Sequence, residues 1–428
     1  MKNIDFQRNL EVTGEYDVLV CGGGLSGVVA ALAAARDGAR VGLLEYTGKL
    51  GGVSVTGQLG AVSGQHMKGE KVVAGILPEI ISRCQSRDGV NDDGWCAVFD
   101  PETLNSVLLE MLDEAGVDLQ LYTPVTGAIR DGEKIEYAVI SGKGSLSALK
   151  AKLFIDATGD GDFAYAAGCE YEYGREEDGQ VQSATLVFRI GGVELDKMPP
   201  NSEITKLWLE VGPKDVPTDH AAIKFIRHPG TTGEVIINMT HILRFDGTST
   251  RELTRARQEG TVQCEKVLEF FRQNITGFGT AYINCTAENI GTRETRRFIG
   301  DYLLTVDDAR GGRDFPDQIA RCWWSIDVHN PIGMHEGSMY SLDKSFGIPY
   351  RCITPKGVKN IYMAGRPISA DHLAFSAVRI ASTCLAIGEA AGTAAVQALK
   401  TGDTHNIDIE ELRSSLLRNG AVTDRQKL

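Results

Sequence analysis

The chain has 428 residues, a length typical of two or three domains or of one large enzyme. Hydrophobic residues make up 42% of it, which is ample for a sizeable core and excludes disorder as the main state. Asp and Glu outnumber Lys and Arg by 57 to 44, and this acidic balance argues against a basic surface for nucleic acid or for an anionic membrane.

The nine cysteines are odd in number, scattered along the chain and never in a CxxC pair. A disulfide framework needs pairs, and a zinc or iron–sulfur site needs closely spaced ligands. We therefore expect no metal site, and cysteines that act as small buried hydrophobic residues. The N-terminal residues lack the apolar core of a signal peptide, and no apolar run reaches the length of a membrane span. Together these features predict a soluble, reduced, cytoplasmic protein.

The first fifty residues predict a strand, a glycine-rich turn, a helix and a second strand. Residues 16–21 (YDVLVC) form a short apolar run typical of a buried parallel strand. Residues 22–27 (GGGLSG) follow at once and carry a GxGxxG motif. Residues 28–38 (VVAALAAARDG) are rich in alanine and end at glycine, as a helix does. A second short strand then ends just before Glu45.

Each part of this unit has a mechanical role in holding a dinucleotide. Gly22 permits the tight turn, Gly24 lets backbone N–H groups reach a pyrophosphate, and Gly27 allows close packing of helix on strand. The start of the helix, where Ser26 lies, offers unpaired amides and a positive dipole end to phosphates. At the end of the second strand, the Glu45 carboxylate can accept hydrogen bonds from ribose hydroxyls. The sequence therefore predicts a dinucleotide site here.

The next segment indicates which dinucleotide binds. Nicotinamide dehydrogenases usually continue into another strand–helix unit, whereas residues 46–58 read YTGKLGGVSVTGQ. This segment resembles the glycine-rich loop that lies along FAD in FAD-dependent oxidoreductases with the glutathione-reductase-like fold. Small residues let backbone amides pass close to an extended cofactor. The resemblance implies that Gly51, Gly52 and Ser54 contact FAD.

Two later segments agree with this resemblance. Residues 153–162 (LFIDATGDGD) are an apolar strand that ends in an ATG motif, and residues 360–366 (NIYMAGR) are a strand that ends at glycine. In such flavoproteins the chain returns to the cofactor at both places. Many relatives have Gly-Asp at the second place, and we expect Arg366 to bind the pyrophosphate instead, because a guanidinium suits phosphate oxygens. The cofactor contacts that the resemblance implies in these segments are Ala157, Thr158, Gly159, Asp162, Gly365 and Arg366.

The last long helix is expected over residues 376–399, a run rich in small side chains. In the family that the chain resembles, the N-terminus of this helix faces the flavin ring, and its positive end would stabilise reduced flavin. The resemblance therefore implies cofactor contacts from Ala377 and Val378. It also implies that a backbone group near Val125 touches the adenine. Noncovalent binding of FAD is the default expectation.

Other elements follow from local patterns. Asp100 followed by Pro101 is a typical helix start, which predicts a helix over residues 103–115 and a strand over 117–125. Residues 132–150 alternate between polar and apolar and predict an antiparallel hairpin. Further along, we expect a short strand over 233–238 and a helix over 250–274.

The predicted fold class is α/β, with a Rossmann-like FAD-binding domain of discontinuous segments and a second, mixed α+β substrate domain. We expect the FAD-binding domain to comprise residues 1–190 and 345–428, and the substrate domain residues 191–344. A second GxGxxG motif and a redox cysteine pair are both missing, which argues against the pyridine-nucleotide disulfide reductases.

Candidate catalytic residues are polar side chains that the fold could bring to the flavin, because the protein must orient a substrate and handle a proton. The resemblance places His372 beside the flavin ring. Asp327 and His329 alternate, so both side chains point to one face of an extended segment, where the carboxylate can raise the basicity of the imidazole. The alternative for each is a structural or surface role.

An arginine cluster lies at residues 290–297 (IGTRETRR) of this otherwise acidic chain. On a helix, Arg293, Arg296 and Arg297 would share one face. They could bind a carboxylate or another anionic group, or they could pair with Glu294 and neighbouring acids.

Two functional hypotheses follow. The first is a FAD-dependent oxidoreductase that transfers a hydride between the flavin and a C–OH, C–N or C=C bond of a small polar substrate. The second is a flavoprotein subunit of an electron-transfer or tRNA-modification complex, because the opening motif also resembles flavoproteins of tRNA modification. The acidic charge argues against an RNA partner and favours the first hypothesis. The electron acceptor stays open, and the small-residue helix would suit a homo-oligomer.

Overall fold

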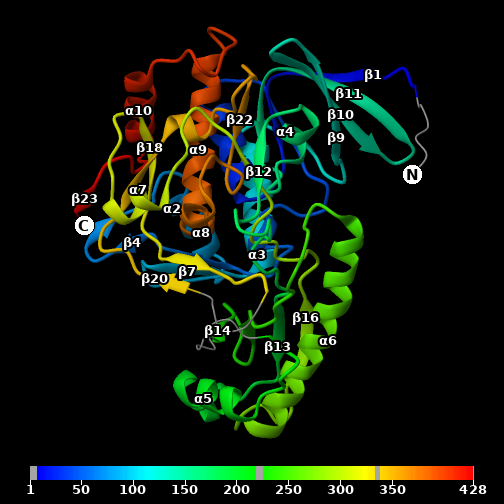
Figure 1. The fold of residues 1–428 in the computed structure, drawn as a ribbon, viewed down its shortest axis with the longest axis vertical. Coiled ribbons are helices and arrows are strands. Elements are labelled where there is room, and N and C mark those ends of the chain that lie inside the picture. Colours follow the sequence, from blue (N-terminus) through cyan, green and yellow to red (C-terminus); the bar gives the residue numbers. More distant parts are fainter. Residues whose placement is uncertain (1–6, 218–224, 333–337, 428) are drawn as a thin grey trace.

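The computed structural model describes residues 7–217, 225–332 and 338–427. A large α/β unit occupies one end of the molecule, and a smaller unit of strands and helices extends from it (Figure 1). The α/β fold class expected from the sequence is therefore confirmed. The seven-stranded sheet of the large unit is formed by β1 (Glu11–Cys21), β2 (Val41–Leu44), β8 (Asp118–Gln120), β9 (Val125–Asp131), β10 (Lys134–Gly142), β11 (Ser145–Asp156) and β22 (Ile361–Met363).

The centre of this sheet is parallel, and its strands end at one edge. β1 pairs in parallel with β2 and with β11, and β11 pairs in parallel with β22. In this register Cys21 lies opposite both Leu44 and Asp156, and Asp156 lies opposite Met363. The loops that follow these four strand ends carry the four predicted cofactor motifs. Because carboxyl ends of parallel strands share an edge, the register brings motifs from distant parts of the sequence together.

The expected hairpin over residues 132–150 is present, since β9, β10 and β11 are successive antiparallel neighbours. The helix expected over 103–115 is α3 (Pro101–Glu114), and the Asp100 carboxylate caps it by accepting a hydrogen bond from the Thr103 N–H. The strand expected over 117–125 is two strands, β8 and β9, with an intervening turn in which Tyr122 has a φ of 56°. That turn sends the chain from the parallel sheet into the hairpin.

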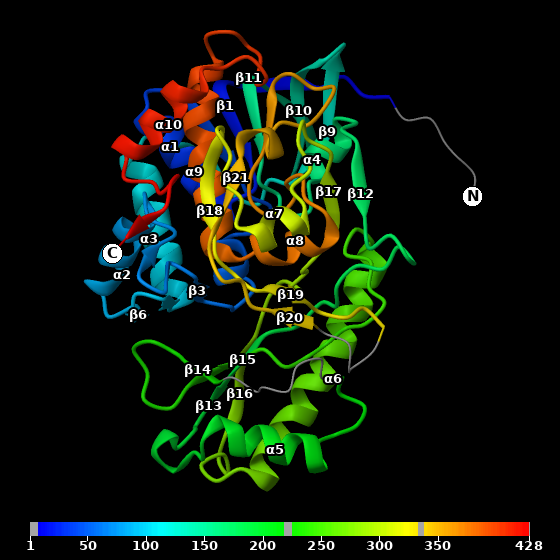
Figure 2. The same ribbon diagram turned by 60° about the vertical axis from the view of Figure 1, so that its left-hand side comes forward.

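Two helices that the sequence places far apart pack closely on this sheet. α1 (Leu25–Arg36) and α9 (Ala381–Ala398) lie side by side (Figure 2). A Cβ built at Gly388 would lie 2.2 Å from the Ser26 carbonyl oxygen, and one at Gly392 would lie 2.2 Å from that of Ala30. The two backbones can approach this closely only because both positions are glycine.

Replacing Gly392 by alanine is therefore expected to lower the free energy of unfolding by about 1–3 kcal/mol, the usual cost of overpacking a core. The control is Gly311→Ala at the end of α7 (Val306–Gly311), where a Cβ would meet no atom within 4 Å. Urea unfolding of both variants measures the difference. Equal stability of the two variants would contradict close contact between α1 and α9.

The expected helix over 376–399 is instead two helices, which corrects the prediction. α8 (His372–Val378) and α9 meet at a bend of 90°. Ile380, at the bend, has extended backbone with φ −67° and ψ 150°. Next to the bend, the Arg379 side chain donates a hydrogen bond to the Asp327 carbonyl oxygen at 3.0 Å, a contact with a segment distant in the sequence. Among the described residues, no single helix is long and apolar enough to cross a membrane, although the bent pair passes that test by length and composition.

Glu389 is a buried carboxyl on α9. One oxygen accepts a hydrogen bond from the Ile76 N–H at 3.2 Å, and the other has no partner in the described structure. Burial raises the pKa of Glu389 from 4.5 to about 7. The fold therefore favours the protonated form, so this stabilisation is complete below pH 4.5 and is lost as the pH rises through about 7.

Replacing Glu389 by glutamine should remove this dependence. Above pH 7 the variant is expected to exceed the wild type in free energy of unfolding by up to about 3 kcal/mol, and below pH 4.5 the difference should vanish. Urea unfolding of both proteins at the two pH values measures this difference. A difference that does not change with pH would show that Glu389 does not titrate in this range.

The smaller unit has its own sheet and core. Its strand order is β14-β15-β13-β16. The predicted helix over 250–274 is observed as α6, and the strand expected over 233–238 contains β15. A separate cluster of buried hydrophobic side chains from this unit forms its core. The elements of the unit are β13 (Phe188–Gly191), α5 (Asn201–Val211), β14 (Phe225–Arg227), β15 (Val235–Ile237), α6 (Thr250–Asn274) and β16 (Tyr282–Thr286).

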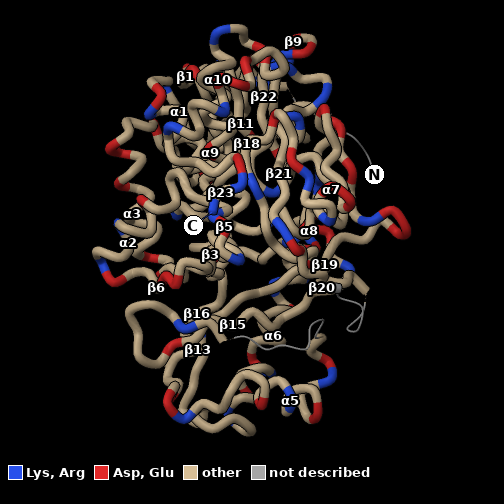
Figure 3. Tube along the Cα trace, turned by 90° about the vertical axis from the view of Figure 1, so that its left-hand side faces the viewer, with Lys and Arg blue, Asp and Glu red and all other residues tan. Residues whose placement is uncertain are grey.

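The core of the large unit draws on residues near the predicted domain boundaries and beyond them. The core of the large unit includes buried side chains from Phe298 to Leu342, a stretch that the sequence assigned to the substrate domain. This stretch returns from the small unit, and its elements pack on α8 and α9. The division of the chain at 190 and 344 stays a prediction. Basic and acidic positions are interspersed over both units in Figure 3. All nine cysteines are free, and six of them are buried.

The remaining elements are short. The helices are α2 (Leu77–Gln85), α4 (Asp162–Ala166) and α10 (Ile409–Arg418), with single turns of 3-10 helix at Gly52–Ser54, Leu195–Lys197 and Tyr350–Cys352. The strands are β3 (Ala61–Ser63), β4 (His66–Met67), β5 (Glu70–Lys71), β6 (Val90–Asp92), β7 (Cys96–Phe99), β12 (Tyr171–Tyr173), β17 (Arg296–Phe298), β18 (Gln318–Cys322), β19 (Ile326–Val328), β20 (Ser338–Tyr340), β21 (Phe346–Pro349) and β23 (Gln426–Lys427).

Candidate functional site

The glycine-rich turn after β1 is held by contacts that only glycine allows. Gly22 has a φ of 108°, and a Cβ there would lie 2.3 Å from the Ala157 carbonyl oxygen. A Cβ at Gly27 would lie 1.9 Å from the Gly22 carbonyl oxygen. The turn after β1, the turn after β11 and the start of α1 are therefore packed against one another at backbone distance.

Gly24 is different, because its backbone does not require glycine. Its φ is −64°, and a Cβ there would meet only the Gly52 Cα, at 4.0 Å. Gly24 is the N-cap of α1, and no side chain caps that helix. The N-terminus of α1 thus presents free amides to a space that a Cβ would begin to fill, which fits a phosphate group of a dinucleotide.

The predicted glycine-rich loop lies against this turn. The Gly51 N–H donates to the Gly23 carbonyl oxygen at 2.8 Å, and Gly51 and Gly52 have φ of 99° and 53°. The buried Ser54 hydroxyl has no hydrogen-bond partner in the described structure. Glu45, which is 5% exposed, accepts from the Gly23 N–H at 2.7 Å and thereby ties the first turn to the second strand.

The turn after β11 depends on a carboxylate that the sequence analysis missed. The Asp156 side chain is fully buried and accepts from the Thr158 N–H, the Thr158 hydroxyl and the Ala164 N–H. Burial raises the pKa of Asp156 to about 6. Asp156 holds the ATG turn in shape through these hydrogen bonds. It lies one residue before the motif, and its position as an acid at the end of a strand is the only sequence feature that could have identified it.

Arg366 faces this turn. Its Nη2 donates to the Asp160 carboxylate at 2.7 Å, while its buried Nη1 has no partner in the described part of the chain. A Cβ built at Gly159, whose φ is 84°, would lie 3.3 Å from the Arg366 Nη2. Gly365, with a φ of 86°, packs on Ser26 of α1. An unsatisfied guanidinium N–H next to a free helix N-terminus fits the phosphate-bearing part of FAD.

The other predicted cofactor residues, Val125, Asp162, Ala377 and Val378, differ in how far they are buried. Val125 is half-buried at the start of β9. Asp162 begins α4, and its carboxylate accepts from Arg296 at 2.9 Å. Ala377 and Val378 are fully buried in the last turn of α8. The N-terminus of the next helix, α9, has Ile380 as its N-cap and no side-chain cap.

A second polar group contains both predicted histidines. His372, the first residue of α8, donates from Nδ1 to the fully buried Glu294 carboxylate at 2.9 Å. The same carboxylate binds the Arg297 guanidinium and accepts from the Gln182 N–H at 3.1 Å. Because the carboxylate can only accept, the proton lies on Nδ1 and the Nε2 lone pair of His372 is left to act as a base.

Gln182 connects this group to the second histidine. Its side-chain oxygen accepts from the His329 N–H at 3.2 Å. The Asp327 carboxylate lies 3.4 Å from the His329 Nε2 and 3.4 Å from the Arg379 Nη2. We call His372, Glu294, Gln182, His329, Asp327 and Arg379 the histidine network.

The arginine cluster is not helical, which corrects the expectation of one shared helix face. Arg296 and Arg297 lie on β17 and point to different partners. Arg293 donates to the Ser183 carbonyl oxygen at 2.6 Å, and Arg296 lies over the Tyr165 ring at 4.2 Å while it pairs with Asp162. Each guanidinium therefore has partners within the protein. Arg296 and Arg297 pair with acidic side chains, Asp162 and Glu294, as the second alternative expected.

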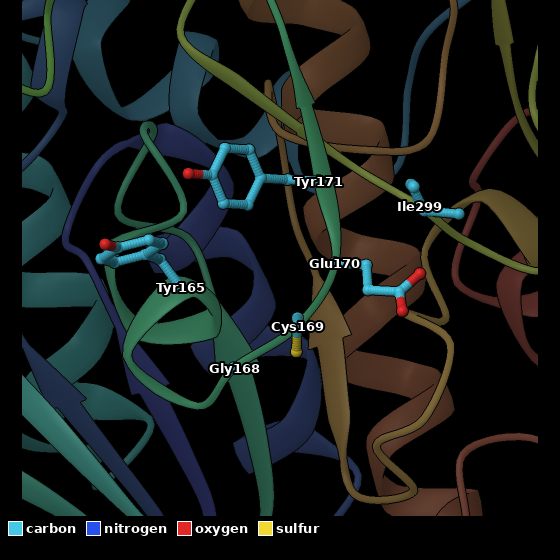
Figure 4. Close-up of a pocket in the computed structure, with 6 residues that line it drawn as sticks. All are labelled: Tyr165, Gly168, Cys169, Glu170, Tyr171 and Ile299. Carbon is cyan, nitrogen blue, oxygen red and sulfur yellow. The ribbon is translucent and has the colours of Figure 1, made fainter.

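The histidine network lies where the chain passes between the two units. Gln182 precedes β13, Glu294 follows β16, and β19 and α8 face the small unit in Figure 2. A surface depression lined by Tyr165, Gly168, Cys169, Glu170, Tyr171 and Ile299 contains none of the predicted site residues (Figure 4). In the described parts of the chain, no group of three or more His, Cys, Asp or Glu side chains could hold a metal ion.

Gln182, Ser183 and Arg379 were not predicted from the sequence as site residues. Neutral amide and hydroxyl side chains in a loop carry no motif, and Arg379 was hidden within an apparent helix. Glu294 was expected only as a partner for arginine.

Comparison with known families agrees with the motifs. The family model described as FAD dependent oxidoreductase matches residues 17–416. No curated protein matches the chain in sequence.

The chain is similar to several solved structures. A geranylgeranyl bacteriochlorophyll reductase-like protein from Thermoplasma acidophilum matches with a TM-score of 0.50 and 14% identity, over 95% of this chain and 84% of its own. A myxobacterial chondrochloren halogenase matches with a TM-score of 0.48 and 14% identity, over 95% and 79%. The p-nitrophenol 4-monooxygenase of Pseudomonas putida matches with a TM-score of 0.45 and 13% identity, over 96% and 85%. At these identities the likeness concerns the fold alone.

Proposed function

Since this chain belongs to the FAD dependent oxidoreductase family, we propose that it transfers a hydride between FAD and a C–OH, C–N or C=C bond of a small polar organic substrate. The protein is an enzyme, and FAD is its cofactor. When bound, FAD supplies the hydride chemistry. The same proposal includes a cytoplasmic location and noncovalent FAD. It also includes a small-molecule substrate, with no nucleic-acid or membrane partner.

The observation that carries the proposal is the contact between His372 and Glu294. A buried carboxylate fixes the proton on Nδ1, so Nε2 can take the proton that leaves a substrate hydroxyl or amine as hydride departs. The buried Arg297 compensates the negative charge of Glu294. The Gln182 N–H, bonded to the other Glu294 oxygen, holds the carboxylate in this orientation.

Two spectroscopic measurements test the proposal. The visible spectrum of the purified protein, recorded before and after denaturation and filtration, shows whether FAD is bound and whether it passes the filter. Anaerobic addition of small alcohols, amines and hydroxy acids should then bleach the flavin without any partner protein. Bleaching only in the presence of a second protein would instead support an electron-transfer subunit.

A further inference from the structure

Three hydrogen-bond donors lie unused in the histidine network and next to it. The Gln182 Nε2, the Ser183 hydroxyl and the Arg379 Nε are each buried, and none has a hydrogen-bond partner in the described structure. The Gln182 and Ser183 side chains are fully buried, and the Arg379 side chain is 13% exposed. Buried donors without partners are costly, so their presence together needs a reason.

The residues that carry these donors, Gln182, Ser183 and Arg379, all contact the backbone of Asp327 or His329, at the end of β19. Arg379 binds the Asp327 carbonyl oxygen at 3.0 Å, the Gln182 side chain binds the His329 N–H at 3.2 Å, and the Ser183 N–H binds the His329 carbonyl oxygen at 3.3 Å. Backbone groups of residues two apart in an extended segment point to the same side. The Arg379 guanidinium, the Gln182 amide and the Ser183 backbone therefore contact the same side of the segment from Asp327 to His329.

Local contacts hold these donors in place without using them. Arg293 donates to the Ser183 carbonyl oxygen at 2.6 Å, and Glu294 accepts from the Gln182 N–H at 3.1 Å. Gln182 uses its oxygen on the His329 backbone, which turns its NH2 group away from that bond. Arg379 uses Nη2 on Asp327 and keeps Nε. One cationic and one neutral donor thus lie within the histidine network, and the Ser183 hydroxyl lies on the residue that follows Gln182.

We infer that these three donors bind a carboxylate group of the substrate. A carboxylate has two oxygens that accept only, which matches a set of unused donors. One of these donors belongs to the Arg379 guanidinium, which also pairs with the Asp327 carboxylate at 3.4 Å. The inference rests on the proposed function and narrows its substrate class to small organic acids. It assigns the carboxylate to Arg379, whose Nε has no partner in the described structure, rather than to the arginines at residues 293–297.

Ser183→Ala is the sharpest variant, because the hydroxyl takes no part in the fold. Removal of a buried hydroxyl without a partner should leave the melting temperature of the unliganded holoenzyme equal or raise it. The same variant should bind the carboxylate about tenfold more weakly, since a hydrogen bond to a charged group is lost. If the serine were purely structural, its replacement would lower the melting temperature and leave carboxylate binding unchanged.

Thr404→Val is the matched control. The Thr404 hydroxyl is also buried without a partner in the described structure, but the Thr404 N–H binds the Lys359 carbonyl oxygen, away from the histidine network.

Two further variants test the other donors. Arg379→Lys keeps the charge and removes Nε. Gln182→Glu keeps the oxygen that binds the His329 N–H and replaces the NH2 donor with a negatively charged oxygen. Both should weaken carboxylate binding on the order of 10- to 100-fold.

The probes are acetate, lactate, succinate and benzoate, each compared with its amide. Binding to the oxidised holoenzyme is followed by the flavin absorption spectrum and by the melting temperature, neither of which requires turnover. We expect at least one acid to bind, its amide to bind more weakly, and the three variants to lose affinity while Thr404→Val does not. Equal binding of acid and amide, no binding by any acid, or wild-type affinity in all three variants would overturn the inference.

These outcomes are separable from those of the proposed function. If compounds bleach the flavin but acids bind no better than amides, hydride transfer stands and carboxylate recognition fails. If acids bind through the three donors but no compound bleaches the flavin, carboxylate recognition stands and hydride transfer fails.

Discussion

Replacing Gly24 by alanine is expected to leave the protein folded and to weaken FAD binding on the order of 10- to 100-fold. A Cβ at this position meets no protein atom closer than 4.0 Å, and the φ of −64° suits alanine. The loss of glycine at the helix N-cap should itself cost only about 1 kcal/mol. The new methyl group would lie in the space in front of the α1 N-terminus, where the pyrophosphate is expected.

Gly27→Ala is the contrasting variant. Its Cβ would lie 1.9 Å from the Gly22 carbonyl oxygen, so α1 would have to move away from the turn. We expect this variant to lose both its fold and FAD. Gly279→Ala, where a Cβ meets nothing within 4 Å, should lose neither. Circular dichroism melting reports the fold, and titration of the apoprotein with FAD reports affinity. Wild-type FAD affinity in Gly24→Ala would show that the pyrophosphate lies elsewhere.

Replacing His372 by alanine is expected to slow flavin reduction by about 10²- to 10⁴-fold while FAD stays bound, which is the usual effect of removing a general base. The reason is the Nδ1 contact with Glu294 at 2.9 Å, which leaves Nε2 to accept the proton. His329→Ala should cause a smaller loss, because the contacts that order this segment are made by the His329 backbone. Stopped-flow absorbance under anaerobic conditions measures both rates.

His405 offers a matched control for this experiment. Its Nδ1 also contacts a carboxylate, that of Asp301 at 2.6 Å, but it lies outside the histidine network. His405→Ala should reduce flavin at the wild-type rate. Added imidazole should partly restore the rate of His372→Ala, which a purely structural histidine would not show. A wild-type rate in His372→Ala would remove this residue from the mechanism.

The cofactor motifs could be recognised from sequence because each one is local. In the first unit, the strand, the turn at Gly22 and the helix start at Gly27 follow one another within a few residues, and glycine is required there by backbone contacts. The helix α6 was predicted at its observed bounds because its hydrophobic spacing extends over seven turns. The single helix predicted over 376–399 was wrong, because composition alone does not reveal the 90° bend between α8 and α9.

The sequence by itself determined the FAD-dependent family and the α/β fold class, because both depend on short-range order: glycines at fixed spacing, strand and helix periodicity, and an acid at a strand end. Only the tertiary structure decided which polar side chains meet. Gln182, Glu294, His329 and His372 belong to four separate segments, and they are joined by hydrogen bonds that depend on distance and direction rather than on spacing in the chain. The tertiary structure also showed which buried donors have no hydrogen-bond partner. Whether a donor has a partner depends on all the atoms around it and not on its residue type.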